Sequence, residues 1–301
     1  MASSFVSSPL ARQASTVSTA RVRRLAERTL ALWHLTSLDA PTVAVVWALA
    51  IARAAHVHLE PWIPTLLATG TWTAYVLDRL LDSRCAVKNQ NAAVLRERHY
   101  FHWRHRRTLL PLATCTAGVA AALIIKLMPD AAREHDSIIA AAALAYFSGV
   151  HSPAQFPRWT RRIASKELLV GMLFAAGCAA PTLTRLRSIA PAWPVVITVC
   201  FLALLAWLNC TAISMWESHS NFSNIPAIAP VLALSGLAIA MVSAPGFAGT
   251  SALLIAGASS ALLLFALHRS RGRLDPITLR ALADLVLLVP AVLLIPGVLR
   301  A

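Results

Sequence analysis

Two carboxylates of this 301-residue chain have a spacing suited to shared chemistry. Asp78 and Asp82 are four residues apart, so a helix places them on one face, about 6 Å apart along its axis. Two acids at this spacing repel each other. A Mg²⁺ ion, which binds few protein carboxylates and keeps its other positions for water and phosphate oxygens, would remove that repulsion. The alternative is an interfacial pair that Arg79 and Arg84 neutralise.

A second group of polar side chains lies at the end of a later apolar run. Asn209 lies inside that run, where a side-chain amide needs a hydrogen-bond partner. Glu217 follows eight residues later and faces within about 80° of Asn209 on a helix. Its own loop offers only His219 as a partner, so we expect a bound cation or a residue of another span beside it. An ordinary solvated acid at a helix end is the alternative.

Three further charged residues are candidates for a site. Lys166 opens an apolar run, where the helix dipole does not favour a cation, so it suits an anionic ligand or reflects membrane topology. Arg98 belongs to the basic and aromatic stretch 96–107, which grips lipid phosphates or clamps a substrate diphosphate. Asp284 follows Arg280 by four residues and is either its local ion-pair partner or, as an intramembrane acid, a candidate catalytic group.

The elements that must position these residues are membrane spans. The chain is 57% hydrophobic and 13% charged, with a mean hydropathy of +0.64, whereas about a quarter of an ordinary domain is charged. We therefore expect an all-α polytopic membrane bundle of about nine transmembrane helices, forming one domain over residues 39–298. The expected spans lie near 39–57, 62–82, 108–128, 136–151, 166–184, 193–213, 226–244, 250–268 and 280–298. Residues 1–38 are expected to be a cytoplasmic tail ending in an interfacial helix over 27–38.

The net charge of +14 is interpreted as a membrane signal and not as a sign of nucleic-acid binding. Most of the Lys and Arg residues lie in the tail and in the loops after the second, fourth and eighth spans. This bias predicts a cytoplasmic N-terminus, both polar groups on the cytoplasmic side and contact with anionic membrane lipids. The expected location is the bacterial inner membrane, with an organellar membrane as the alternative, because residues 1–26 are rich in Arg and Ser and contain no acid.

Over about residues 39–298 the chain resembles the UbiA superfamily of intramembrane prenyltransferases. That family has nine spans and two aspartate-rich motifs, which lie at the cytoplasmic ends of the second and sixth spans. The first motif corresponds here to Ala74-Tyr75-Val-Leu-Asp78-Arg-Leu-Leu-Asp82, in which two aspartates remain and Ala74-Tyr75 replace the leading Asn-Asp. The second corresponds to Asn209-Cys210-Thr-Ala-Ile213-Ser-Met-Trp-Glu217, in which Cys210 and Ile213 replace two aspartates. The segment from Tyr146 to Gly171 is similar to the Tyr…Lys…Gly stretch of the family.

The resemblance implies transfer of a prenyl group from an allylic diphosphate to a hydrophobic aromatic or lipid acceptor. It implies that Mg²⁺, held by Asp78, Asp82 and Glu217, neutralises the leaving diphosphate. The implied substrate-binding residues are Arg79, Arg98, Tyr146 and Lys166, and the implied catalytic residues are Lys166, Asn209 and Asp284. An apolar groove between spans would hold the prenyl chain and keep water from the allylic cation.

The replaced aspartates leave a second hypothesis open. The same fold, without catalysis, would bind an isoprenoid, a lipid or a protein partner. A transporter is disfavoured, because transporters place polar residues at mid-membrane in paired broken helices, whereas the polar groups here gather at one membrane face.

Overall fold

The computed structural model describes residues 21, 24–88, 97–151, 166–186, 192–217, 224–243 and 247–297, apart from the side chains of 85–88, 135 and 146–151. Within these ranges the regular structure is helical and includes no β-strand. The elements, in chain order, are the helix Arg24–Leu35, α2 (Asp39–Ala54), α3 (Trp62–Lys88), α4 (Glu97–Arg104), α5 (Arg106–Leu127), α6 (Asp130–His151), α8 (Lys166–Leu186), α9 (Trp193–Glu217), α10 (Ile225–Ser243), α11 (Ala248–Ser270), η2 (Arg271–Arg273), α12 (Pro276–Val286) and η3 (Val289–Leu294).

All nine apolar segments predicted as spans coincide with helical structure. The first eight correspond to α2, α3, α5, α6 and α8 to α11, and the ninth is divided between α12 and η3. Among the described helices, five are long and apolar enough to cross a membrane: α5, α8, α9, α10 and α11 extended to Arg273. The helix Arg24–Leu35 and α2, bent by 85° at their junction, make a sixth if they form one broken span. The all-α membrane class is confirmed, whereas nine crossings, a cytoplasmic N-terminus and a bacterial inner membrane stay predictions.

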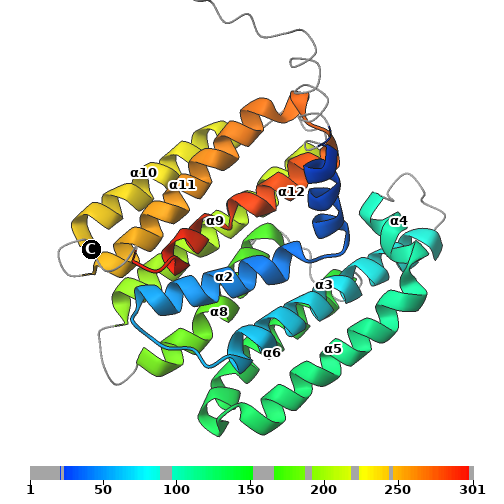
Figure 1. Ribbon diagram of the computed structural model, residues 1–301, viewed down its shortest axis with the longest axis horizontal. Helices are drawn as coiled ribbons and strands as arrows, with labels where there is room; N and C mark the ends of the chain where they lie inside the picture. Colours follow the sequence, from blue (N-terminus) through cyan, green and yellow to red (C-terminus); the bar gives the residue numbers. More distant parts are fainter. Residues whose placement is uncertain are drawn as a thin grey trace, which may run out of the picture.

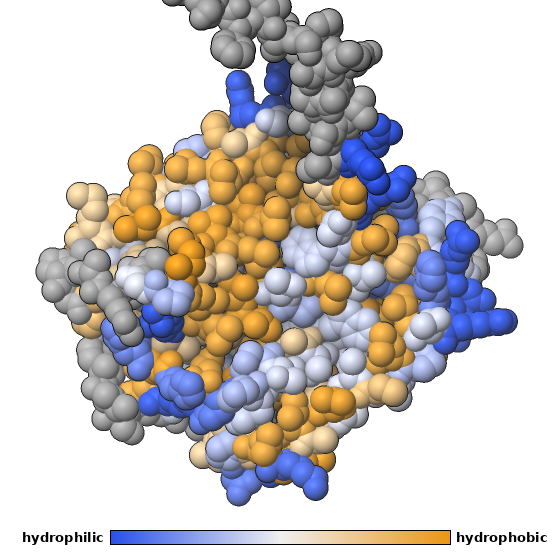
Figure 2. Space-filling model, viewed as in Figure 1, coloured by the Kyte–Doolittle hydropathy of each residue, from blue (hydrophilic) through white to orange (hydrophobic). Residues whose placement is uncertain are grey.

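The outward faces of the helices carry large apolar side chains. On α10, Leu234, Met241 and Val242 are 67%, 79% and 84% exposed. Apolar side chains cover much of the face drawn in Figure 2, and hydrophilic side chains gather toward its edges. An apolar surface of this extent is typical of contact with lipid, because lipid tails are as apolar as these side chains and their exposure costs no hydration free energy there.

Small residues let neighbouring helices approach closely inside the bundle. The helices α10 and α11 lie side by side, as do α3 and α5, and α8 packs on α9 (Figure 1). At Gly171 of α8 a Cβ atom would lie 2.7 Å from the backbone oxygen of Ala203 in α9. A Cβ atom added at Gly236 of α10 or at Gly257 of α11 would lie 2.7 Å from the ring of Phe201 in α9. Packing through small residues is the usual means of association between helices in lipid.

The ninth predicted span is not one continuous helix, which corrects the expectation for 280–298. The helix α12 ends at Val286 because Pro290 has no N–H to donate to the Val286 carbonyl one turn earlier. Ser260 Oγ donates to that carbonyl instead at 2.9 Å, and Trp47 Nε1 donates to the Leu287 carbonyl at 2.8 Å. Side chains of α11 and α2 therefore satisfy backbone groups that the break leaves free, as apolar surroundings require.

Candidate functional site

A cavity of about 410 Å³ lies where the first turns of α2 and α8 meet the C-terminal halves of α3 and α9. Its apolar wall includes Val43, Val170, Phe174, Ala206, Ile213 and Leu287. The remaining lining includes charged side chains from six helices, among them Arg98 of α4 and Asp284 of α12. The cavity therefore combines an apolar surface with charged groups at one place in a mostly apolar bundle.

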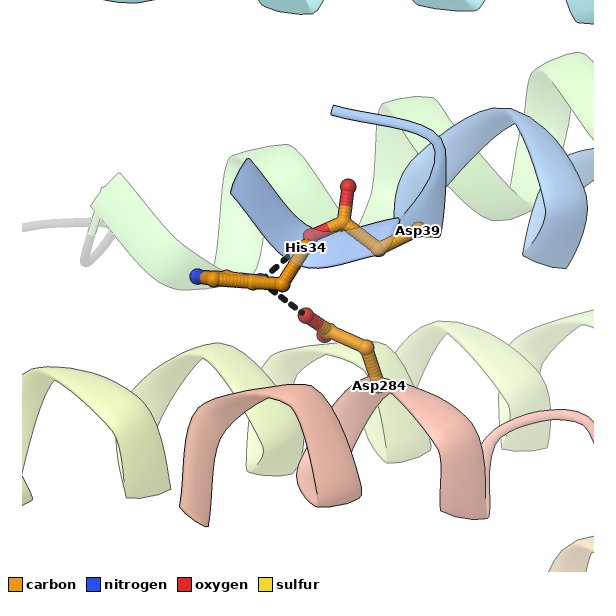
Figure 3. Close-up of side chains that lie close together, drawn as sticks. All are labelled: His34, Asp39 and Asp284. Carbon is orange, nitrogen blue, oxygen red and sulfur yellow. Dashed lines mark hydrogen bonds and ion pairs between the residues drawn. The ribbon is translucent and has the colours of Figure 1, made fainter. Parts of the chain in front are cut away.

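The most enclosed polar group in this cavity is formed by His34, Asp39 and Asp284 (Figure 3). His34 Nδ1 lies 2.7 Å from Asp39 Oδ2 and 3.6 Å from Asp284 Oδ2. On the other side of Asp284, Asn209 Nδ2 donates a hydrogen bond to Oδ1 at 3.0 Å. The predicted catalytic pair Asn209 and Asp284 is thus brought together, and it is joined by two residues that the sequence analysis did not select, His34 and Asp39.

No local sequence signal distinguishes His34 and Asp39. Asp39 lies in the first turn of α2, where an acid is ordinary because it complements the helix dipole. His34 lies in the helix Arg24–Leu35, which the sequence predicts as an interfacial helix. The two side chains meet only because the chain turns by 85° between these helices, with Ser37 at φ 61°.

Arg79 links the residues at the bend between the helix Arg24–Leu35 and α2. Its Nη1 donates to the carbonyl of His34 at 2.9 Å and to Ser37 Oγ at 2.7 Å, and its Nη2 lies 3.5 Å from Asp39 Oδ2. Arg79 lines the cavity, as expected of a substrate-binding residue, but its guanidinium is directed to the protein itself. The forked guanidinium is suited to this bend, because it contacts several acceptors from one buried position.

The hydrogen-bond chain continues from Ser37 to His102 of α4. His102 Nδ1 donates to the carbonyl of Arg98 at 2.8 Å, so Nε2 accepts from Ser37 Oγ at 3.1 Å. Burial, together with the nearby charges of Arg79 and Arg98, lowers the pKa of His102 from 6.5 to about 4. At neutral pH His102 is therefore uncharged and serves as an acceptor.

Glu217 is paired with arginines of two other helices. Arg280 Nη2 of α12 lies 2.6 Å from Glu217 Oε1, and Arg98 Nη1 of α4 lies 3.6 Å from the same atom. The sequence left two kinds of partner open for Glu217, a bound cation or a residue of another span. The structure places arginines of α4 and α12 beside it. The local pairing of Arg280 with Asp284 is corrected, because Arg280 makes its ion pair with Glu217 and Asp284 pairs with His34.

The other predicted site residues lie in different surroundings. Asp78 and Asp82 are not among the residues lining the cavity, and the Asp82 side chain is 44% exposed, 3.9 Å from His99 Nε2. Lys166 lines the cavity and is exposed at the start of α8, and within the described part of the chain it makes no ion pair. The side chain of Tyr146 lies outside the described residues.

This placement gives no support to a Mg²⁺ ion shared by Asp78, Asp82 and Glu217. Glu217 faces the cavity but is neutralised by arginines, whereas the two aspartates of α3 are not part of the lining. The magnesium set stays a prediction. The face of α3 that lines the cavity instead presents Tyr75 and Arg79.

Among the buried polar atoms of the cavity residues, one ring nitrogen and one amide oxygen have no hydrogen-bond partner in the described structure. They are His34 Nε2 and Asn209 Oδ1, and both side chains are at least 97% buried. Buried polar atoms are almost always paired, so unpaired ones next to a cavity indicate where a polar ligand would bind. A second cavity, of about 710 Å³, lies at the C-terminal half of α2 near Arg53 and His56 and has no acidic residue in its lining.

Comparisons of the chain with protein-family models, with curated proteins and with solved structures return no match.

Proposed function

We propose that the protein is a membrane-embedded prenyltransferase, which moves a prenyl group from an allylic diphosphate to a hydrophobic aromatic or lipid acceptor. The observation that carries the proposal is one cavity in which the cationic Arg98 and Lys166 lie beside the apolar wall that includes Phe174. An amphiphile with an anionic head at Arg98 and Lys166 and an apolar chain matches these parts of the lining, which also carries the carboxylates of Asp39, Glu167, Glu217 and Asp284. The volume of about 410 Å³ falls in the range of ligand sites, roughly 300–1,000 Å³.

The cationic side chains suit the diphosphate end of the substrate. Lys166 provides a compact positive charge, and the planar guanidinium of Arg98 is suited to two phosphate oxygens at once. When the allylic C–O bond breaks, its electron pair leaves with the diphosphate, and fixed positive charge stabilises that leaving group. Glu217 holds Arg98 and Arg280 near the cavity, so the cations are positioned before the substrate arrives.

The remaining groups suit the acceptor. The acceptor donates the electron pair that forms the new bond to the allylic carbon, and it then loses a proton. Asp284 is a candidate base, because it lines the cavity and Asn209 Nδ2 holds its orientation by a hydrogen bond of 3.0 Å. The apolar wall keeps water from the allylic cation until this bond has formed.

The test is prenyl transfer by the purified protein in lipid nanodiscs, with Mg²⁺ or Mn²⁺ present. Diphosphate release and product formation are measured with geranyl and longer prenyl diphosphates and a panel of aromatic and lipid acceptors. Lys166→Ala is expected to lower kcat/KM at least about tenfold, which is the effect of losing one charge contact to the leaving group. The matched control is Lys126→Ala, at an exposed lysine in the last turn of α5, and it should leave the rate unchanged.

One observation favours a second candidate function, a non-catalytic protein that binds isoprenoid diphosphates or lipids. Neither acid kept in the first motif, Asp78 or Asp82, is part of the cavity lining. The same samples distinguish the two functions. Binding of prenyl diphosphate without turnover supports the binding protein, and the absence of both overturns the prenyltransferase proposal.

A further inference from the structure

We propose that His34, Asp39 and Asp284 form a binding site for a divalent transition-metal ion, at a place different from the magnesium set expected at Asp78, Asp82 and Glu217. The proposal concerns metal binding by the protein alone. It does not depend on prenyl transfer.

The first support is the convergence of three ligand atoms from three separate elements. One ligand atom from each side chain, a ring nitrogen or a carboxylate oxygen, lies within 4.8 Å of the other two. Ligand bonds of about 2.0–2.2 Å place neighbouring ligands of one ion about 3 Å apart. The distances from His34 Nδ1 to Asp39 Oδ2 and Asp284 Oδ2, 2.7 and 3.6 Å, lie on either side of that value.

The second support is the balance of charge. With a neutral imidazole, the two carboxylates carry two negative charges, and Arg79, 3.5 Å from Asp39, supplies one positive charge. One negative charge remains in a site of which Asp39 and His34 are each 2% exposed. A cation compensates such a buried charge, either a proton on His34, which lies beside both carboxylates, or a metal ion that replaces that proton. A dication would leave the site positive and so would also attract an anionic substrate head.

An independent observation on a fourth residue points to the same ligand. Asn209 is 3% exposed and donates through Nδ2 to Asp284, yet its amide oxygen Oδ1 has no hydrogen-bond partner in the described structure. An amide oxygen is a ligand for hard and borderline metal ions. Asn209 therefore offers an unused oxygen donor beside the carboxylate that it already contacts.

The donor set selects the class of ion. One imidazole nitrogen with carboxylate and amide oxygens suits Mn²⁺, Fe²⁺ or Zn²⁺, whereas Mg²⁺ prefers oxygen ligands in a near-octahedral arrangement. We therefore expect the protein to bind Mn²⁺ more tightly than Mg²⁺. Because the ligands come from the helix Arg24–Leu35, α2 and α12, a bound ion would also link these three elements.

The experiment is a titration of the full-length, tag-free and EDTA-treated protein with Mn²⁺ alone, without any prenyl diphosphate. Free Mn²⁺ is counted by electron paramagnetic resonance, and nitrogen coupling to the bound ion is read from electron spin-echo modulation. The expected result is one ion per chain, with coupling to an imidazole nitrogen. Asp284→Asn and His34→Gln should each weaken binding at least about tenfold, and His34→Gln should abolish the nitrogen coupling.

Controls separate this site from the alternatives. Asp130→Asn, at an exposed acid of α6, should bind Mn²⁺ like the unaltered protein. Asp78→Asn should also bind normally, and a loss there with normal binding by Asp284→Asn would overturn the proposal in favour of the α3 motif. No Mn²⁺ binding by the unaltered protein, or binding without nitrogen coupling, would overturn it as well. Because the titration contains no substrate, its result does not depend on whether the protein transfers prenyl groups. A failure to bind Mn²⁺ likewise does not decide the test of prenyl transfer.

Discussion

Arg79 illustrates at the scale of single residues how a three-dimensional partner changes the role of a side chain. From the sequence, Arg79 neutralises Asp78 and Asp82 next to it, or binds a substrate anion. In the structure its guanidinium contacts His34, Ser37 and Asp39, which lie about 40 residues earlier in the chain. These contacts fix the position of His34 and Asp39, the two site residues that the sequence alone did not identify.

His102 leads to a prediction on pH dependence at the same scale. Its pKa of about 4 in the folded protein is lower than the 6.5 of an unperturbed histidine, because burial and two arginines disfavour the charged form. The unfolded chain therefore binds this proton more tightly than the folded one. The contribution of neutral His102 to the free energy of unfolding is therefore complete above pH 6.5. It is lost progressively as the pH falls toward 4.

The measurement is the thermal unfolding midpoint in detergent between pH 7 and pH 4. The unaltered protein should lose stability over this interval, and His102→Asn should lose less, because the difference in proton binding at this position is removed. His105→Asn is the control, since His105 lies on the exposed side of the same region. Parallel pH profiles for the unaltered protein and His102→Asn would refute the assignment.

At the scale of elements, two glycines of α8 give opposite expectations for the same change. Gly171 lies against α9, where an added Cβ atom would be 2.7 Å from the Ala203 oxygen and 2.8 Å from the Trp207 nitrogen. These are backbone atoms, so α8 and α9 would have to separate. Gly171→Ala should therefore destabilise the protein by about 1–3 kcal/mol, as overpacking of an interior does.

Gly177 provides the matched comparison on the same helix. No atom lies within 4 Å of a Cβ atom added there. Gly177→Ala should leave stability unchanged or raise it by up to about 1 kcal/mol, through the better helix propensity of alanine. The two variants are compared by thermal unfolding in detergent. Equal midpoints would show that α8 and α9 do not approach as closely as described.

The helices could be predicted from the sequence because each one carries its own signal. Runs of apolar residues locate nine segments that are helical in the described ranges, from α2 to the divided segment of α12 and η3. The break after Val286 was missed, although Pro290 is visible in the sequence, because a proline inside a membrane helix is tolerated when other side chains satisfy the freed carbonyls. Whether Ser260 and Trp47 reach those carbonyls depends on packing between distant segments.

At the scale of the whole molecule, the site could be predicted only in part. The sequence predicts that residues near the ends of the second and sixth spans lie close together. In the structure, Arg79 of α3 and Asn209 and Glu217 of α9 line the same cavity. The orientation of α3 about its own axis could not be predicted, because Tyr75, Asp78, Arg79 and Asp82 all lie within two helical turns. A small rotation decides which of them face the cavity. Tyr75 and Arg79 do, and Asp78 and Asp82 do not.

The central claim is that a prenyl diphosphate binds in the cavity where α2 and α8 meet α3 and α9, with its chain along the apolar wall. The most direct test is photolabelling of the protein in nanodiscs with a geranyl diphosphate analogue that carries a photoreactive tail, followed by peptide mapping. We predict labelled peptides from α8 and α9, around Phe174 and Ile213, with labelling suppressed by excess geranyl diphosphate and reduced by Lys166→Ala. Labelling confined to the second cavity, around Leu49 and His56, or labelling that excess geranyl diphosphate does not suppress, would contradict the claim.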